Sequence, residues 1–235
     1  MSNTNNTACQ HCGKDIKIKQ ITLKSLFYDT INVIFNLEKG FLFTIKMLFI
    51  NPGSVLNGYL KTTDRYRYYN PFRYAFILAT ASVFFFVYFD LYEKAITIGA
   101  LNLEADNKEG VEFIEKYANF ISLLIIPFLS LGSFLFFKSH NYAEHLVANF
   151  FVFGQTTLIG FVFLPLYLAL PKLILQQQSI SSLTLIIYGV LFYKSAFKQS
   201  WLKTIFKFLA AMIIGFVCVV LVGALIAMVI SAVNS

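Results

Sequence analysis

The chain has few charged residues and few cysteines, and both shortages restrict its structural class. Only 13% of its 235 residues are charged, against about 25% in soluble domains, whereas 57% are apolar. Three cysteines, at positions 9, 12 and 218, do not imply a disulfide framework. Residues 1–20 are polar and contain no apolar run of the kind that a cleavable signal peptide needs. The composition indicates a protein whose side chains face lipid and neighbouring helices.

What the chain does have is long apolar runs. A helix needs about 20 apolar residues to cross about 30 Å of hydrocarbon. The chain contains five apolar runs, and most of them reach that length. They are Pro71–Phe89, Ala118–Phe137, Leu146–Leu170, Ile180–Phe197 and Thr204–Val233. We therefore predict an all-α, polytopic transmembrane helix bundle of about five spans, and we expect the third run to kink or end at Pro165.

Basic residues are distributed unevenly around these runs. With the N-terminus inside and five crossings, fifteen of the nineteen Lys and Arg residues lie on the cytoplasmic side, as the positive-inside rule requires. The run Ile180–Phe197 has the shortest apolar core, but without its crossing the bias would fall to eleven against eight. We predict a multi-pass protein with a cytoplasmic N-terminus and membrane lipid as its first partner, because anionic lipid attracts a basic face.

Three segments follow from these patterns. Apolar residues recur at helical spacing in two short stretches, Leu23–Phe35 and Phe41–Phe49, the second ending at Asn51-Pro52-Gly53. Both are too short and too polar to span, so we predict amphipathic helices at the inner interface. The expected organisation is a polar tail (1–20), amphipathic interfacial helices (21–70) and the transmembrane bundle (71–235).

The polar tail contains half of a zinc knuckle, Cys9-Gln-His-Cys12. A structural zinc site takes four ligands, and this pair supplies two. His140 and His145 on the same side, or a second copy of the chain, could complete the site. The alternative is a degenerate knuckle that binds no metal.

His140, Glu144 and His145 form a cluster of hydrogen-bonding and titratable groups at a membrane boundary. On a helix, Asn149, Thr156 and Gly160 fall near the same face as His145. Polar groups at membrane depth suggest metal ligation or general-base work, or they join helices by hydrogen bonds. No catalytic signature such as His-Glu-x-x-His is present, and no charged residue lies at mid-depth in a predicted span.

Arginine and tyrosine alternate just before the first predicted span. Such a run can stack nucleic-acid bases, but at the headgroup level it anchors a helix, so we predict an anchor and expect no nucleic acid. The predicted anchor residues are Arg65, Arg67, Tyr68, Tyr69, Arg73 and Trp201.

In the last apolar run, small residues recur at multiples of four. Such spacing lets helices approach closely. The contact lies either within the bundle or in a homo-oligomer, through Gly215, Gly223 and Ala227.

Six sequence blocks carry a family resemblance: Ile21–Leu26, Glu38–Thr44, Asn51–Leu60, Arg67–Arg73, Asn141–Leu146 and Gln199–Thr204. Together they resemble the domain-of-unknown-function 3667 family of uncharacterised bacterial integral membrane proteins. The resemblance implies a helical fold in the bacterial cytoplasmic (inner) membrane. Family members often begin with a four-cysteine ribbon, of which this chain has only the first pair. The family offers no established activity.

Two functional hypotheses follow. The first is a non-enzymatic membrane adaptor or small permease-like bundle, and the second is a membrane-embedded, metal-assisted enzyme that uses His140, Glu144 and His145. A deep cavity lined by these three residues with Asn149 would favour the enzyme, whereas a packed interface would favour the adaptor.

Changing Arg65, Arg67 and Arg73 together to Glu tests the anchor. We expect the topology to survive, because acidic residues contribute little to orientation. Accumulation should fall, since each Arg is worth on the order of 1 kcal/mol of attraction to anionic lipid. The measurements are a topology reporter at Ser235 and the amount of protein in membranes. A variant that accumulates normally, stays correctly oriented and loses a specific partner or nucleic acid would make the block a recognition site.

Overall fold

The computed structural model describes residues 6–8, 15–17, 39–60, 65–91 and 108–234, and the chain divides into two compact units, Met1–Lys39 and Gly40–Ser235. In the first unit, strands β1 (Asn6–Ala8) and β2 (Asp15–Lys17) pair antiparallel, with Thr7 opposite Ile16. The sequence patterns did not predict this hairpin. Cys9, Cys12 and the predicted helix over Leu23–Phe35 lie outside the described residues.

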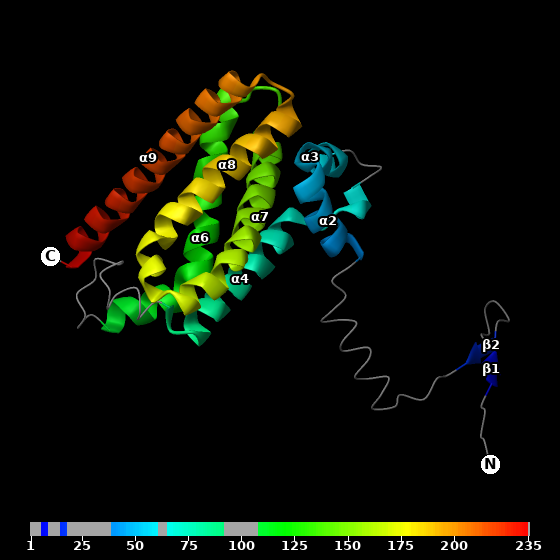
Figure 1. Cartoon of the computed structure of the whole chain (residues 1–235), viewed down its shortest axis with the longest axis horizontal. Helices are drawn as coiled ribbons and strands as arrows, with labels where there is room; N and C mark the ends of the chain where they lie inside the picture. Colours follow the sequence, from blue (N-terminus) through cyan, green and yellow to red (C-terminus); the bar gives the residue numbers. More distant parts are fainter. Residues whose placement is uncertain (1–5, 9–14, 18–38, 61–64, 92–107, 235) are drawn as a thin grey trace, which may run out of the picture. The chain divides into compact units, whose positions relative to one another are not determined.

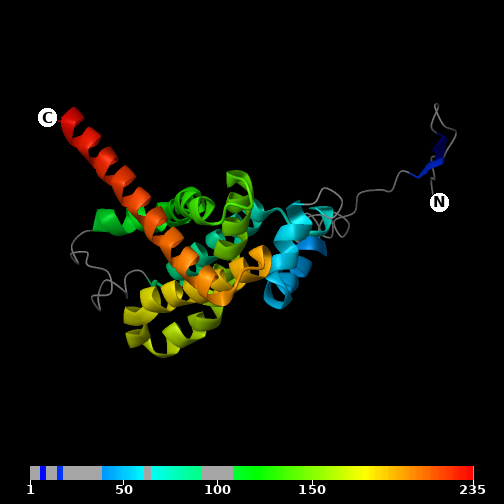
Figure 2. The same ribbon diagram turned by 90° about the horizontal axis from the view of Figure 1, so that it is seen from above.

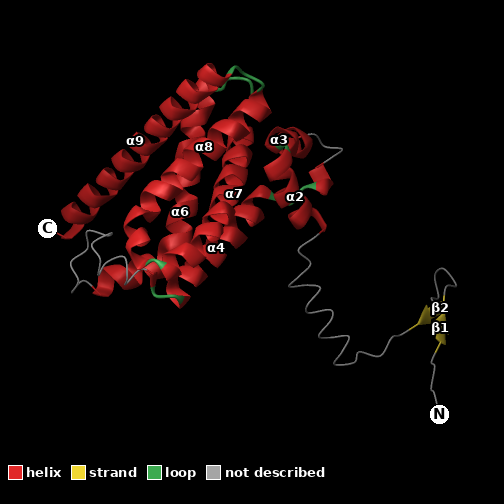
Figure 3. Ribbon diagram, viewed as in Figure 1, coloured by secondary structure: helices red, strands yellow, loops and turns green. Residues whose placement is uncertain are grey.

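The described part of the second unit is entirely helical (Figure 1). Its elements are α2 (Lys39–Ile50), α3 (Pro52–Leu60), η1 (Arg65–Arg67), α4 (Pro71–Tyr88), α6 (Lys108–Phe136), α7 (Tyr142–Ala169), η2 (Pro171–Gln176), α8 (Gln177–Phe197) and α9 (Trp201–Asn234). The five long helices α4, α6, α7, α8 and α9 coincide with the five predicted apolar runs, and Figure 3 shows them as one helical body. The all-α bundle is confirmed; the short helix α3 was not predicted.

Four helical segments in the described residues are long and apolar enough to cross a membrane. They are Arg65–Tyr88, Tyr142–Ala169, Ser179–Phe197 and Trp201–Leu225. The remaining long helix, α6, has 29 residues and begins at Lys108, ahead of the predicted apolar run Ala118–Phe137. Because about 20 residues suffice for a span, α6 also has the length to cross.

Local sequence signals set several helix ends. Asn70 caps α4 by accepting a hydrogen bond from the backbone N–H of Arg73 (3.1 Å), and Pro71 follows at the first helical position. At α8 the chain leaves the helix through Lys198, which has a left-handed backbone (φ 51°). A helix end at Pro165 is wrong, since α7 continues to Ala169.

Helix pairs approach closely where glycine faces a neighbouring backbone. Helix α6 packs along α9, and α4 packs along α7 (Figure 1). A Cβ added to Gly132 on α6 would collide with the backbone of Ala211 on α9, and one on Gly215 would lie 2.9 Å from Leu129 Cα. The C-terminal part of α9 extends past its neighbours (Figure 2). There, a Cβ at Gly223 would have no neighbour within 4 Å.

Large apolar side chains on every long helix are exposed at the surface of the unit. They include Phe84 on α4, Leu124 on α6, Val162 on α7, Ile187 on α8 and Phe216 on α9. Soluble monomers rarely expose such extensive apolar surface. Together with helices of spanning length, this surface indicates a membrane protein.

Replacing Gly132 by Leu should destabilise the bundle, because the new side chain has no room between α6 and α9. Overpacking of this kind costs typically about 1–3 kcal/mol. Thermal unfolding of the purified protein in detergent measures the effect. The matched control is Gly223→Leu, which adds the same side chain where the structure leaves open space and should unfold like the wild type. Equal stability of the two variants would contradict the packing.

Candidate functional site

His145, the central residue of the predicted catalytic cluster, lies in the first turn of α7 and is 0% exposed. Its Nε2 is 2.8 Å from the backbone carbonyl oxygen of Phe137, just after the end of α6. A carbonyl only accepts, so this geometry assigns the proton of a neutral imidazole to Nε2. The ring therefore joins the start of α7 to the end of α6.

Aromatic rings surround this histidine. Phe197 stacks on the His145 ring with centroids 5.4 Å apart and an angle of 18° between the planes. Tyr193 lies parallel to the same ring at 6.3 Å. Phe197 also contacts the His140 ring at 4.8 Å. The space around His145 is thus occupied by side chains of α8.

The other two cluster residues make local bonds. Glu144 completes a capping box: its carboxylate accepts from the backbone N–H of Asn141 (2.7 Å), and the Asn141 side chain accepts from the N–H of Glu144 (2.9 Å). The Nδ1 of His140 is 3.0 Å from the hydroxyl of Ser139. Among the described residues, no group of three His, Cys, Asp or Glu side chains could hold a metal ion.

Asn149 connects α7 to α6 through a network of hydrogen bonds. Its amide nitrogen donates to the hydroxyls of Ser130 and Ser133, each at 3.1 Å. These serines donate in turn to the backbone carbonyls of Ile126 and Ser130. Every hydroxyl in the network therefore both donates and accepts, and the buried polar groups of Asn149 contribute to helix packing.

Gln155 connects the same helix to α4. Its side-chain oxygen accepts a hydrogen bond from the hydroxyl of Tyr74, and both side chains are fully buried. Thr156 instead donates to the Phe153 carbonyl of its own helix (2.9 Å). The polar face predicted from sequence thus divides into a packed section at His145 and Asn149 and a second section that begins at Thr156.

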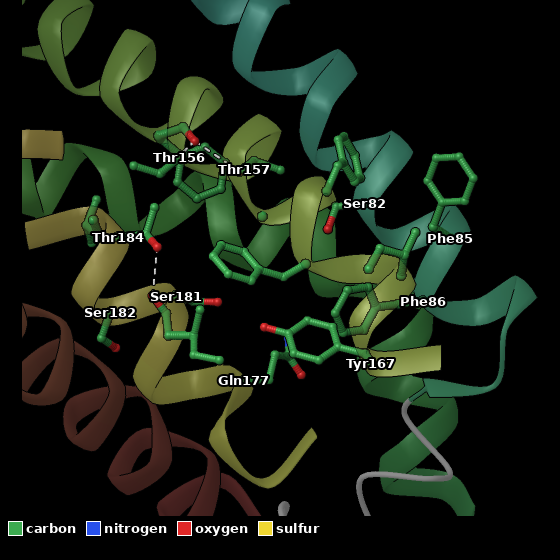
Figure 4. Close-up of a pocket in the computed structure, with 17 residues that line it drawn as sticks. Ser82, Phe85, Phe86, Thr156, Thr157, Tyr167, Gln177, Ser181, Ser182 and Thr184 are labelled. Carbon is green, nitrogen blue, oxygen red and sulfur yellow. Dashed lines mark hydrogen bonds between the residues drawn. The ribbon is translucent and has the colours of Figure 1, made fainter. Parts of the chain in front are cut away.

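That second section lines a cavity of about 250 Å³ between α4, α7 and α8 (Figure 4). Eight of its lining residues are aromatic or aliphatic on these three helices: Phe85, Phe86, Phe153, Phe161, Phe163, Leu164, Ile180 and Leu185. The others are glycine or carry hydroxyl or amide groups: Ser82, Thr156, Thr157, Gly160, Tyr167, Gln177, Ser181, Ser182 and Thr184. Of these, the sequence had singled out Thr156 and Gly160 alone.

The predicted anchor block surrounds the start of α4. Arg65 lies over the Tyr59 ring at 4.8 Å and Arg67 over the Phe43 ring at 5.3 Å. Arg73 is exposed, whereas Tyr69 is buried and its backbone N–H donates to Thr44 (2.8 Å). Arg65 and Arg67 are therefore held on aromatic rings of α3 and α2.

The two remaining anchor residues differ in their surroundings. Tyr68 is half-buried and packs on Phe43 at 5.6 Å. Trp201 is exposed at the start of α9, with the Lys194 ammonium over its ring at 4.5 Å.

The small residues that recur along α9 also have different surroundings. Gly215 faces Leu129 of α6 within the bundle, whereas Gly223 has open space around it. The side chain of Ala227 lies outside the described part of the chain.

Comparison with known proteins gives one match. No curated protein and no solved structure matches the chain. Residues 38–86, which include α2, α3, the arginine and tyrosine block and most of α4, match the family described as "Protein of unknown function (DUF3667)". This match includes the Pro-Gly to Asn-Pro-Phe segment on which the resemblance depended most. The likeness covers residues 38–86 alone, and over that part the chain is similar to the DUF3667 family of proteins of unknown function.

Proposed function

We propose that the protein is a non-enzymatic integral membrane adaptor of the bacterial cytoplasmic membrane, with its N-terminus in the cytoplasm. The observation that carries this proposal is the packing of the predicted catalytic cluster. His145 is enclosed by Phe197 and Tyr193 and bonded to Phe137. A catalytic base needs its acceptor atom within reach of a substrate, and here aromatic side chains occupy that space.

The orientation rests on the distribution of charge. Lys194, Lys198, Lys203 and Lys207 flank the junction between α8 and α9. Arg65, Arg67 and Arg73 flank the start of α4. Four consecutive crossings, by α4, α6, α7 and α8, put both groups on the same side of the membrane. The positive-inside rule assigns that side to the cytoplasm.

The adaptor surface proposed here is the exposed arginine group at the start of α4. Arg65 and Arg67 are exposed, and their guanidinium groups rest on aromatic rings. Such stacking orders a long side chain and leaves its charge accessible. An anionic lipid headgroup or an acidic partner segment fits such a surface.

One observation favours the enzyme hypothesis. Within the described residues, the Nδ1 of His145 is buried and has no hydrogen-bond partner. A buried acceptor without a partner is costly, and a metal ion or a substrate proton could satisfy it. The experiment below therefore decides between the two functions.

Metal content separates the hypotheses. The full chain carrying Cys9→Ser and Cys12→Ser removes the half knuckle and leaves the histidine cluster as the zinc site to be tested. We expect this protein, purified without chelator, to contain less than about 0.1 zinc per chain, because fewer than three ligands converge there. The matched variant adds His145→Asn and should show the same content. About one zinc per chain, lost on that addition, would establish the metal site and overturn the adaptor.

A reporter fused at Ser235 tests the orientation. With five crossings, a reporter that is active only outside the cytoplasm should be active, and one that is active only inside should be silent. The control is the same pair of reporters at Lys198, between α8 and α9, where the result should be reversed. Cytoplasmic activity at Ser235 would contradict five spans.

A further inference from the structure

The cavity between α4, α7 and α8 plays no part in the adaptor function proposed above. We propose that it is a binding site for the hydroxyl- or ester-bearing part of an uncharged lipid. Its volume is about 250 Å³, and a cavity of about 150 Å³ in an apolar core already holds a benzene-sized molecule.

The lining determines the charge of the ligand. No Asp, Glu, Lys, Arg or His is among the residues that line the cavity. A phosphate or carboxylate would therefore be buried without a counter-charge, which is strongly unfavourable in a low-dielectric site. The ligand must be neutral.

The polar groups determine its functional groups. Tyr167 is only 5% exposed, yet its hydroxyl points into the cavity beside Gln177 (Figure 4). Within the described part of the chain, the structure gives that hydroxyl no hydrogen-bond partner. The hydroxyl opens onto the cavity space, so a ligand carbonyl or hydroxyl can form a hydrogen bond with it there.

A second set of hydroxyls offers acceptors. Thr157 donates to the Phe153 carbonyl (2.9 Å) and Thr184 donates to the Ile180 carbonyl (2.8 Å). Their protons are therefore used, and their lone pairs remain free to accept. A ligand hydroxyl fits these acceptors, and an ester carbonyl fits Tyr167 and Gln177. A monoacylglycerol carries both groups.

The open space at the cavity contrasts with close helix packing at other glycines of α7 and α8. A Cβ at Gly154 on α7 would collide with the Tyr74 ring, and one at Gly189 on α8 would collide with the Phe208 ring. At Gly160, which is on α7 and lines the cavity, a Cβ would meet no atom within 4 Å. Close-packed interiors leave few such voids.

Access from the membrane is available on α8. Ser181 and Ser182 belong to the cavity lining and are exposed. Leu183 and Ile187 on the same helix are exposed apolar residues. A lipid can therefore place its polar part in the cavity and leave its acyl chain on the apolar surface of α8.

The test uses a monoacylglycerol with a photoactivatable diazirine at the carbonyl end of its acyl chain, next to the polar part that enters the cavity, added to the full chain in phosphatidylcholine nanodiscs. Mass spectrometry of peptides then locates the label. We expect labelling within residues 153–167 and 177–185, displaced by excess monooleoylglycerol and not by oleoyl-lysophosphatidylglycerol, which carries a charge.

Two variants and one control make the test specific. Gly160→Leu fills the cavity without a backbone clash and should lower labelling of these peptides at least about fivefold. Gly223→Leu adds the same side chain away from the cavity and should label like the wild type. Tyr167→Phe keeps the ring and removes the hydroxyl, so displacement by monooleoylglycerol should need about fivefold more competitor, as for one lost hydrogen bond.

Several results would overturn the site. These are label spread over the lipid-facing helices, unchanged labelling of a folded Gly160→Leu protein, or equal displacement by the charged lipid. If Gly160→Leu does not give a monodisperse protein, Tyr167→Phe decides, and unchanged displacement in that variant refutes the proposal.

Discussion

The structure depends on one constraint of the hydrocarbon region, where a polar group must find its hydrogen-bond partner within the protein. Backbone groups meet this constraint by forming long helices. The Nε2 of His145, the amide nitrogen of Asn149 and the side-chain oxygen of Gln155 meet it across helix boundaries, through Phe137, the Ser130–Ser133 pair and Tyr74. These contacts fix how α7 lies against α6 and α4, and thereby where its remaining polar face lies.

Close packing at glycine complements the polar contacts. Lipid tails are as apolar as leucine, so helices associate where small residues let their backbones approach. Gly132 and Gly215 bring α6 and α9 together, and Gly154 accommodates Tyr74 between α7 and α4. Gly160 breaks this pattern, because no neighbouring side chain fills the space in front of it. Helix α7 is therefore closely packed at Gly154, whereas it borders a cavity at Gly160.

The two sections of the α7 face differ in chemistry. At His145, the imidazole and the capping carboxylate of Glu144 are used in packing and helix capping. At Thr156 and Tyr167, hydroxyl groups border an uncharged cavity. The arginine group at the start of α4 is a third feature, in which aromatic rings hold exposed cations. The proposed adaptor contact and the proposed lipid site therefore use separate residues, so that each can be tested without altering the other.

Composition and periodicity alone determined the helical class and the five long helices, because apolar length and helix caps such as Asn70 and Asn141 are local properties. The family block was recognised by its resemblance to known sequence motifs. The sequence also placed His145, Asn149, Thr156 and Gly160 on one face. It could not show that Phe197, distant in the chain, encloses His145, or that Ser82, Tyr167 and Gln177 meet around one cavity. Those facts depend on which helices are neighbours. Only tertiary packing decides this, since the exposed apolar surfaces of the helices are chemically alike and do not specify their partners.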